Sequence, residues 1–251
     1  MLKKIIEKML IAVKNFLLPL HCIVCEKENE YICKDCLSLI PIRKKDICPL
    51  CEKEITRFGA VCRKCKIKKD NYLDGLIVAT YYEHPAVKKM IHDLKFLGFQ
   101  MAAEYLAKIL LIKINSEKDF SLENFLFLNV PIHQKKKAIR GFNQTEIIVN
   151  TLKLLLERNG PNRKIEIRSD IIFKKNFHTA QSKIKSLSQR RENVKDTFDI
   201  DKHTGFKLPH QVIVFDDVVT TGATLNEIAK VLKSRGVKKV WGLTIAREVF
   251  I

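Results

Sequence analysis

Several features that mark large protein classes are missing from this 251-residue sequence. No run of apolar residues approaches the roughly 18 that a helix needs to cross a bilayer. Charged residues interrupt the apolar positions of the first 20 residues, and no small-residue cleavage site follows them, which argues against a secretory signal. Neither end carries a lipidation motif. We therefore expect a soluble, cytoplasmic protein.

Acidic residues are scarce beside basic ones. The 28 Asp and Glu face 46 Lys and Arg, which gives a formal net charge of +18. A hydrophobic fraction of 46% with 14 Phe supplies a packed core, so a wholly disordered chain is not expected despite that charge. The basic excess is spread along the sequence and attracts polyanions through its long-range field, without identifying one. The alternative is a Lys-rich, solvated surface with no polyanionic partner.

Cysteine is absent after residue 65, and the eight cysteines up to that point form four CxxC pairs. The pairs are Cys22/Cys25, Cys33/Cys36, Cys48/Cys51 and Cys62/Cys65. A secreted disulfide scaffold does not fit a sequence with a long cysteine-free remainder and no signal. Two thiolates separated by two residues can reach one ion, and two such pairs complete the tetrahedral sulfur shell that zinc prefers. We therefore predict structural Zn²⁺, two ions per chain.

The pairing of the CxxC motifs stays open at this point. Chain order gives two short zinc ribbons, C-x2-C-x7-C-x2-C and C-x2-C-x10-C-x2-C, and the alternative is interleaved. The metal either replaces a hydrophobic core in a short segment or also presents a surface to nucleic acid. The residues expected to contact nucleic acid are Arg63, Lys64, Lys66, Lys68 and Lys69, with Tyr31, Phe58 and Tyr72 as candidates for base stacking.

After the cysteines, the apolar pattern alternates between strand and helix periods, which predicts a parallel α/β sheet. The expected helices are at residues 1–18, after Pro85, at 101–112, after an Asn143 N-cap and at 225–232. The expected strands are at 74–82, 125–130, 212–215 and 240–246. A basic loop is expected at 133–142.

No Walker phosphate loop and no G-x-G-x-x-G turn occur, yet residues 212–225 (VIVFDDVVTTGATL) follow another phosphate-binding pattern. An apolar strand ends in two carboxylates, and a loop of small and hydroxyl residues leads into an amphipathic helix. This order places backbone N–H groups and the positive helix end around an anion. Carboxylates so near a phosphate would repel it unless they face sugar hydroxyls or a metal. We therefore predict a ribose 5-phosphate ligand.

These residues resemble the 5-phosphoribosyl-1-diphosphate (PRPP) signature of type I phosphoribosyltransferases. The resemblance implies that Asp216 and Asp217 are the catalytic acids and hold the ribose 2′- and 3′-hydroxyls. It also implies that Mg²⁺ accompanies PRPP. The implied PRPP-binding residues are Val218, Thr220, Thr221, Gly222, Ala223 and Thr224.

The whole sequence is similar to the ComF family of competence proteins, which join an N-terminal helix, a multi-cysteine zinc module and a phosphoribosyltransferase domain. Residues 82–98 (YEHPAVKKMIHDLKFLG), 130–144 (VPIHQKKKAIRGFNQ) and 178–198 (HTAQSKIKSLSQRRENVKDTF) match motifs of that family, although His178 stands where a basic residue is common. The expected fold class is α/β. A parallel-sheet type I phosphoribosyltransferase domain at 71–251 follows an amphipathic helix at 1–20 and a double zinc ribbon at 21–70.

Two basic segments are predicted to neutralise the diphosphate of PRPP. One is the loop at 133–142, and the other is a basic flap at 168–195. Their candidate contacts are Lys135, Lys136, Lys137, Arg140, Gln181 and Arg191.

Two functions are consistent with these features. The first is a ComF-like DNA uptake protein that handles single-stranded DNA in the cytoplasm and carries a PRPP-binding site. Its expected partners are single-stranded DNA, DNA-uptake helicase or channel proteins, and the inner membrane surface, on which the N-terminal helix can lie. The second is a phosphoribosyltransferase that acts on a small base or nucleotide-salvage substrate and has no DNA role. We favour the first, and PRPP turnover is left open.

Overall fold

The structure is a computed structural model that describes residues 20–68, 70–117, 119–122, 125–159, 165–175, 194–201 and 205–248. The helix expected at residues 1–18 lies outside these ranges. Within them, no helix combines the length and apolar character that a bilayer crossing requires.

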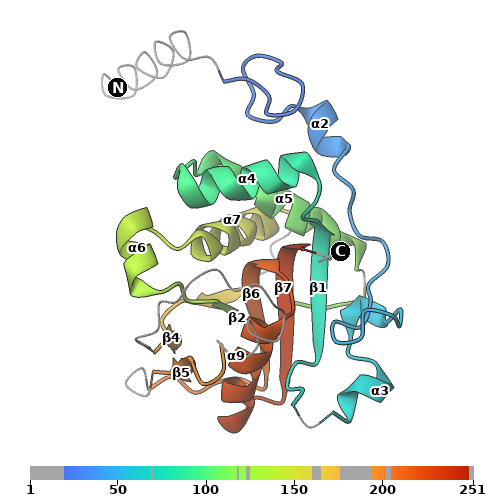
Figure 1. Cartoon of the computed structure of the whole chain (residues 1–251), viewed down its shortest axis with the longest axis vertical. Coiled ribbons are helices and arrows are strands. Elements are labelled where there is room, and N and C mark those ends of the chain that lie inside the picture. Colours follow the sequence, from blue (N-terminus) through green and yellow to red (C-terminus); the bar gives the residue numbers. More distant parts are fainter. Residues whose placement is uncertain are drawn as a thin grey trace.

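Five parallel strands form the central sheet in the order β1-β7-β6-β2-β3 (Figure 1). Their bounds are β1 Gly75–Tyr81, β2 Leu126–Asn129, β3 Glu166–Arg168, β6 Gln211–Val219 and β7 Lys239–Arg247. The central strands are almost continuously apolar and buried, as expected when helices cover both faces of a parallel sheet. The predicted parallel α/β architecture is confirmed.

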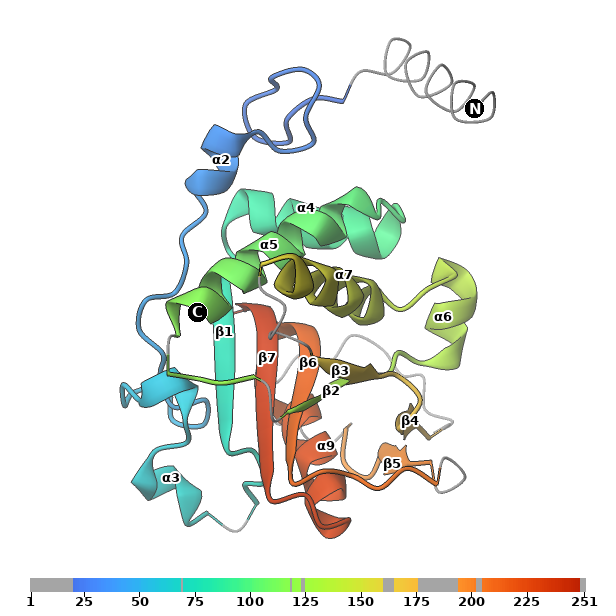
Figure 2. The same cartoon turned by 180° about the vertical axis from the view of Figure 1, so that it is seen from behind.

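Helices cover the two faces of the sheet unequally. One face carries α5 (Met101–Ser116) and α7 (Gln144–Arg158), and the other carries α9 (Ala223–Ser234), as Figures 1 and 2 show from opposite sides. Helix α4 (Pro85–Phe96) packs on α5 above the carboxyl ends of the strands. This edge of the sheet is where ligands bind in open α/β folds.

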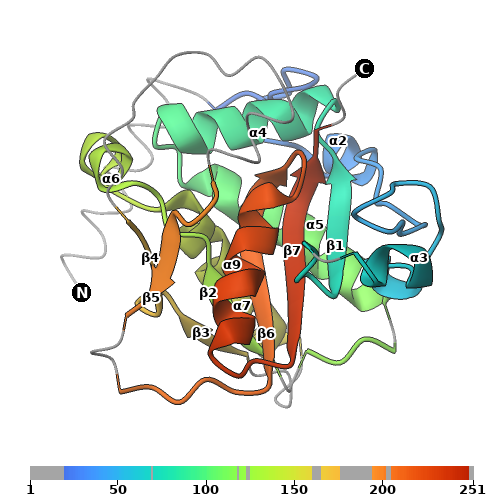
Figure 3. The ribbon, with the colours of Figure 1, turned by 60° about the horizontal axis from the view of Figure 1, so that its bottom comes forward.

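Three segments differ from the sequence expectations. The basic loop predicted at 133–142 is largely helical, as α6 (Gln134–Arg140), because Gln, Lys, Ala and Arg are good helix formers. The strand predicted at 212–215 continues through the acid pair to Val219 as β6. The basic flap predicted at 168–195 begins with strand β4 (Ile172–Lys174), which pairs with β5 (Phe198–Ile200) beside α9 (Figure 3). The remainder of that flap, 176–193, lies outside the described residues.

The cysteine-containing segment packs against the sheet at its β1 edge. Arg43 N donates to Ala79 O at 2.9 Å, Thr80 Oγ1 donates to Pro41 O, and a β-bridge joins Ala60 to Gly75. These contacts cover an edge strand that would otherwise be open to pairing with another chain. Short helices α2 (Lys34–Ser38), η1 (Arg57–Gly59) and α3 (Arg63–Lys66) belong to this segment. The domain boundary at residue 70 stays a prediction.

Candidate functional site

The acid pair lies within β6, near its carboxyl end. Successive side chains of a strand point to opposite faces of the sheet, so Asp216 and Asp217 diverge. Asp217 is only 4% exposed, and its carboxylate accepts hydrogen bonds from Lys95 Nζ at 2.9 Å and from Gln144 Nε2 at 3.1 Å. Asp216 is half-buried, and its Oδ1 accepts from the backbone N–H of Asp217. Asp217 is thus anchored by the α4 and α7 side of the sheet, whereas Asp216 has an oxygen without a partner among the described residues.

A chain of polar contacts joins three segments at this site. Arg140 Nη1 donates to Gln144 Oε1 at 3.0 Å, and Gln144 in turn donates to Asp217. The guanidinium of Arg140 lies 5.2 Å from the ring centre of Phe96, next to Lys95 in α4. Arg140, a predicted diphosphate contact, is therefore brought to the acid pair together with Lys95.

The environment of the two carboxylates changes the acidity of one of them. Burial and the charge of Asp217 raise the pKa of Asp216 from 3.8 to about 7, and Lys95 offsets this only in part. A carboxyl group in this state can accept from a hydroxyl or bind a cation once it loses its proton. The site therefore favours a ligand that brings positive charge or hydroxyl donors.

The predicted phosphate loop follows β6 directly. Gly222 is the N-cap of α9 with φ +73°, a left-handed conformation that residues with a Cβ rarely adopt, and it provides no side-chain cap. The first amides of the helix have no intrahelical acceptor, although Thr221 Oγ1 accepts from Ala223 N at 3.3 Å. All residues from Thr220 to Thr224 are half-buried, so an anion can reach them. The hydroxyls of Thr220 and Thr224 are available beside these amides.

Further cations gather at α6. Lys136 and Lys137 are exposed, and burial together with the charge of Lys136 lowers the pKa of Lys174 in β4. Because Lys136 and Lys174 lie close enough to repel each other, a bound anion between them would be favoured. The side chain of Lys135 and the predicted contacts Gln181 and Arg191 lie outside the described residues.

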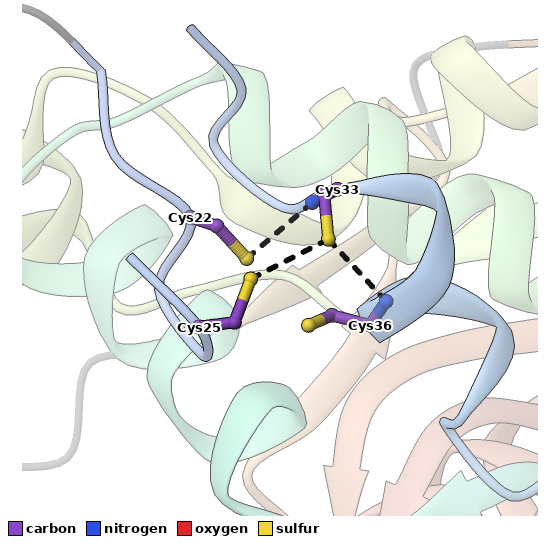
Figure 4. A group of neighbouring side chains, drawn as sticks. All are labelled: Cys22, Cys25, Cys33 and Cys36. Atoms are coloured by element: carbon purple, nitrogen blue, oxygen red, sulfur yellow. Dashed lines mark hydrogen bonds between the residues drawn. The ribbon is translucent and has the colours of Figure 1, made fainter. Parts of the chain in front are cut away.

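The cysteines form two clusters in chain order, which settles the pairing left open by the sequence. The first cluster holds Cys22, Cys25, Cys33 and Cys36, and the second holds Cys48, Cys51, Cys62 and Cys65. Within each cluster the four sulfur atoms lie within 4.8 Å of one another. Figure 4 shows the first cluster with its sulfur atoms converging.

The geometry of the clusters fits a four-coordinate metal ion. Sulfurs at about 2.3 Å from a tetrahedral ion lie about 3.8 Å apart. The Cys25–Cys33 and Cys51–Cys62 sulfur pairs are separated by 3.6 and 3.9 Å. Backbone N–H groups lower the pKa of one thiol in each cluster, Cys22 and Cys51, to about 6, whereas neighbouring thiols and burial raise the pKa of Cys36 and Cys65. The spacing of the four sulfur atoms is what allows each cluster to hold one ion, to which cysteine binds as the thiolate.

The predicted nucleic-acid residues are exposed around α3, except Lys69, which lies outside the described residues. Arg63, Lys64, Lys66 and Lys68 point their charges to solvent, and Lys64 forms a 3.6 Å surface pair with Glu54. The base-stacking prediction for Tyr31 is wrong, because this ring is 4% exposed and packs on Phe99 and Tyr105. Phe58 and Tyr72 are half-buried.

Sequence reasoning missed Lys95, Gln144 and Lys174 as site residues. Lys95 and Gln144 stand inside the two motif stretches at 82–98 and 130–144 that carried the family resemblance, so their position was a signal. The contact of both with Asp217 depends on the α4 and α7 packing, which the sequence does not give.

No protein-family model matches this chain. Curated relatives match it over most of its length. DNA utilization protein YhgH of Escherichia coli O157:H7 is 30% identical over 216 residues, which cover 84% of this chain and 89% of the relative. Competence protein F of Haemophilus influenzae is 27% identical, with 85% and 96% covered, and competence protein ComFC of Streptococcus pneumoniae is 24% identical, with 90% and 91% covered.

Among solved structures, a hypoxanthine phosphoribosyltransferase from Staphylococcus aureus aligns with a TM-score of 0.35 and 15% identity, covering 59% of this chain and 65% of that one.

Proposed function

The chain belongs to the family of DNA utilization protein YhgH and the ComF competence proteins, and we propose from this that it handles single-stranded DNA and binds PRPP at the carboxyl edge of its sheet. The names of the relatives support the DNA role. The net charge of +18 and the exposed cations around α3 supply phosphate contacts. The expected setting is the cytoplasm, beside DNA-uptake proteins or the inner membrane surface.

Zinc is the metal that we propose for both cysteine clusters. Four thiolates in a tetrahedral arrangement are typical of structural zinc and leave no open position for catalysis. The two ions hold the segment before the sheet, where the short elements α2 and α3 could not fold on their own side-chain packing.

One observation carries the PRPP site: the carboxylate of Asp216, which has an oxygen without a partner among the described residues, is followed after a short loop by the amino end of α9, whose N-cap Gly222 supplies no side-chain hydrogen bond. In our proposal the loop from Thr220 to Thr224 binds the 5′-phosphate, and Asp216 accepts from the ribose hydroxyls. Asp217 positions Lys95 rather than the sugar, because Lys95 and Gln144 already occupy its oxygens.

The cations on the other side of the site suit the diphosphate of PRPP. Lys95 and Arg140 are linked to Asp217 directly and through Gln144, and their charges would stabilise diphosphate as it departs, with Lys136 on the same helix as Arg140. Mg²⁺ supplies further neutralisation of the diphosphate when it is bound with PRPP. No general base is required for such a displacement, because positioning and charge provide most of the catalysis.

Calorimetry with PRPP and Mg²⁺ tests the site. Asp216→Asn should weaken PRPP binding, and Gly222→Val should weaken it further, since valine disfavours a φ of +73° and adds a side chain at the anion position. Asp119→Asn, at an exposed surface ion pair, is the charge-matched control. Equal PRPP affinity in the wild type and both site variants would exclude the site.

A binding experiment with single-stranded DNA tests the DNA role. The affinity should fall with salt, by about 0.7 log units per log unit of salt for each phosphate contact. Replacing Arg63, Lys64 and Lys66 together by alanine should reduce this slope. Failure of the wild type to bind DNA, combined with release of diphosphate from PRPP in the presence of a free base, would instead favour the phosphoribosyltransferase without a DNA role.

A further inference from the structure

A cavity of about 510 Å³ lies beside the phosphate loop and away from the acid pair. We call it the α9 cavity. Its lining comes from the second cysteine cluster segment (Pro49, Leu50), the stretch that precedes β1 (Lys68, Asn71, Tyr72) and the first turns of α9, from Thr221 to Lys230. Neither Asp216 nor Asp217 lines it. The phosphate loop therefore contributes Thr221, Gly222 and Ala223 to the α9 cavity, whereas the acid pair does not line it.

Hydrogen bonds fix the walls of the α9 cavity in place. Asn226 Oδ1 accepts from the backbone N–H groups of Tyr72 and Leu73 at 2.8 and 3.2 Å, and its Nδ2 donates to Asp70 O at 2.9 Å. The neighbouring lining residue Glu227 accepts through Oε1 from Asp196 N at 2.9 Å. Both contacts use side chains on the second turn of α9, so the cavity is preformed.

The chemistry of the lining is that of a nucleotide site. Tyr72, Pro49 and Leu50 offer an aromatic and apolar wall for a base, and the volume falls within the range of about 300–1,000 Å³ that is typical of small-molecule sites. Lys68 and Lys195 are exposed and form no ion pair within the described ranges. Glu227 and Asp70 also line the cavity, but Glu227 is occupied by Lys230 and Asp196.

We propose that the α9 cavity binds the nucleotide on the 5′ side of a phosphodiester held by the phosphate loop, so that a DNA single strand places the free 3′-hydroxyl of its terminal sugar at the acid pair and runs from there through the loop and along α9. PRPP ends at its 5′-phosphate and leaves the α9 cavity unused, whereas a DNA strand continues beyond that phosphate and fills it. The inference rests on the proposed function, and it adds that DNA and PRPP compete for the same loop.

The test measures binding of a short single-stranded oligothymidylate by fluorescence anisotropy. Tyr72→Ala should weaken DNA binding by about 5- to 150-fold, the range expected for loss of one stacked base, whereas Tyr72→Phe should retain it. Lys68→Ala should lower the salt slope by about 0.7. Lys238→Ala, at an exposed lysine that precedes β7 and does not line the cavity, is the charge-matched control and should leave both unchanged.

Competition between PRPP and DNA can be measured in the wild-type protein, so this test does not depend on whether a variant folds. Excess PRPP with Mg²⁺ should displace the oligothymidylate. Simultaneous binding of both ligands without mutual effect, or equal DNA affinity of Tyr72→Ala and the wild type, overturns the α9 inference while the PRPP and DNA sites of the proposed function stand. Binding of thymidine monophosphate but not of the oligomer in a Tyr72-dependent manner also overturns it. Absence of any DNA binding would count against the proposed function itself.

Discussion

The two cysteine clusters have the same ligand pattern but are attached to the sheet by different forces. The first cluster belongs to the main hydrophobic core: Cys22, Cys33 and Cys36 are buried with side chains of α4 and α5. The second cluster forms a small core of its own with Val61, and charged residues join it to the rest of the protein. Apolar packing predominates around the first cluster, whereas the second adds contacts from the buried cations Lys113 and Arg247.

The contacts around each cluster illustrate the contrast. Near the first, the Tyr31 hydroxyl donates to Asp93 of α4 at 3.0 Å, and its ring packs on Phe99 and Tyr105. Near the second, the fully buried Lys113 of α5 contacts Asp46 at 2.9 Å and Glu117 at 2.6 Å.

The second cluster is also held from β7 and packs closely on β1. The buried Arg247 donates to Pro49 O at 3.2 Å and pairs with Glu52. A Cβ on Gly59 would lie 2.0 Å from Leu76 O, so this segment approaches β1 too closely for any other residue. The first cluster therefore positions α4, which carries Lys95, and the second builds one wall of the α9 cavity.

The largest expected effect is that of losing one metal ion, and it should differ between the two clusters. Cys25→Ser and Cys51→Ser should each lower the zinc content from two ions to one by elemental analysis, because each removes one of four ligands. Structural zinc contributes about 10–16 kcal/mol to folding in small zinc modules. Cys25→Ser should lower the main thermal unfolding transition, because its cluster shares the main core, whereas Cys51→Ser should unfold its own segment first.

Equal effects of the two substitutions on the main transition would contradict this comparison. The matched control is Cys25→Ser examined beside the wild type after chelation, which should bring both proteins to the same metal-free state.

The next effect concerns the ion cluster that attaches the second segment. Lys113→Met leaves the carboxylates of Asp46 and Glu117 without their buried cation, and such a loss costs about 3–5 kcal/mol. Lys108→Met, which breaks the exposed pair with Glu104, should cost about 0.5 kcal/mol or less. Urea unfolding measures both. A Lys113→Met protein as stable as Lys108→Met would show that the ion cluster does not hold the segment.

Much of this architecture follows from local sequence patterns, and the rest depends on long-range packing. The apolar runs predicted β1, β2, β6 and β7, and Asn143 caps α7 as expected, its side chain accepting from Thr145 N. The three-residue strands β3, β4 and β5 were not predicted, because so short a segment has no period to detect. The same limit applies to Lys113, whose lysine type predicts exposure and whose burial depends on Asp46, 67 positions away.

The site shows the same division. The acid pair and the loop after it could be identified from one contiguous stretch, because their chemistry is carried by neighbours in sequence. The partners of Asp217 come from α4 and α7, 122 and 73 positions away, and only the fold brings them together. Tyr31 failed as a stacking residue for a related reason: an aromatic residue among zinc ligands has no local signal that separates a solvent face from a helix contact.

A smaller effect is expected at the aromatic contact of the first cluster. Tyr31→Phe keeps the ring packing on Phe99 but removes the hydrogen bond to the buried Asp93, which should cost about 1.5–3 kcal/mol. Because Asp93 precedes Lys95 by two residues in α4, PRPP affinity should fall as well. Tyr105→Phe provides a control ring on the same surface without a contact to Asp93. Unfolding by urea and calorimetry with PRPP give the two readouts, and a stability loss with unchanged PRPP affinity would separate the first cluster from the site.

The last effect distinguishes Asp216 from Asp217 by the pH dependence of stability. Burial and Asp217 raise the pKa of Asp216 from 3.8 to about 7, so between these values the folded protein holds a proton that the unfolded chain has released. This group therefore contributes stability that is fully present below about pH 4 and is lost as the pH rises through about 7. Asp216→Asn removes the dependence, and its thermal midpoint should rise relative to that of the wild type between pH 5 and pH 8, as measured by calorimetry in steps of about one pH unit. Asp217→Asn should instead leave the half-buried Lys95 without its counter-ion and lower the midpoint across that range. The difference in thermal midpoint between Asp216→Asn and the wild type could instead stay constant from pH 5 to pH 8. Asp216 would then already be ionised in the folded protein, and the contrast between Asp216 on the α9 side and Asp217 on the α4 side would not hold.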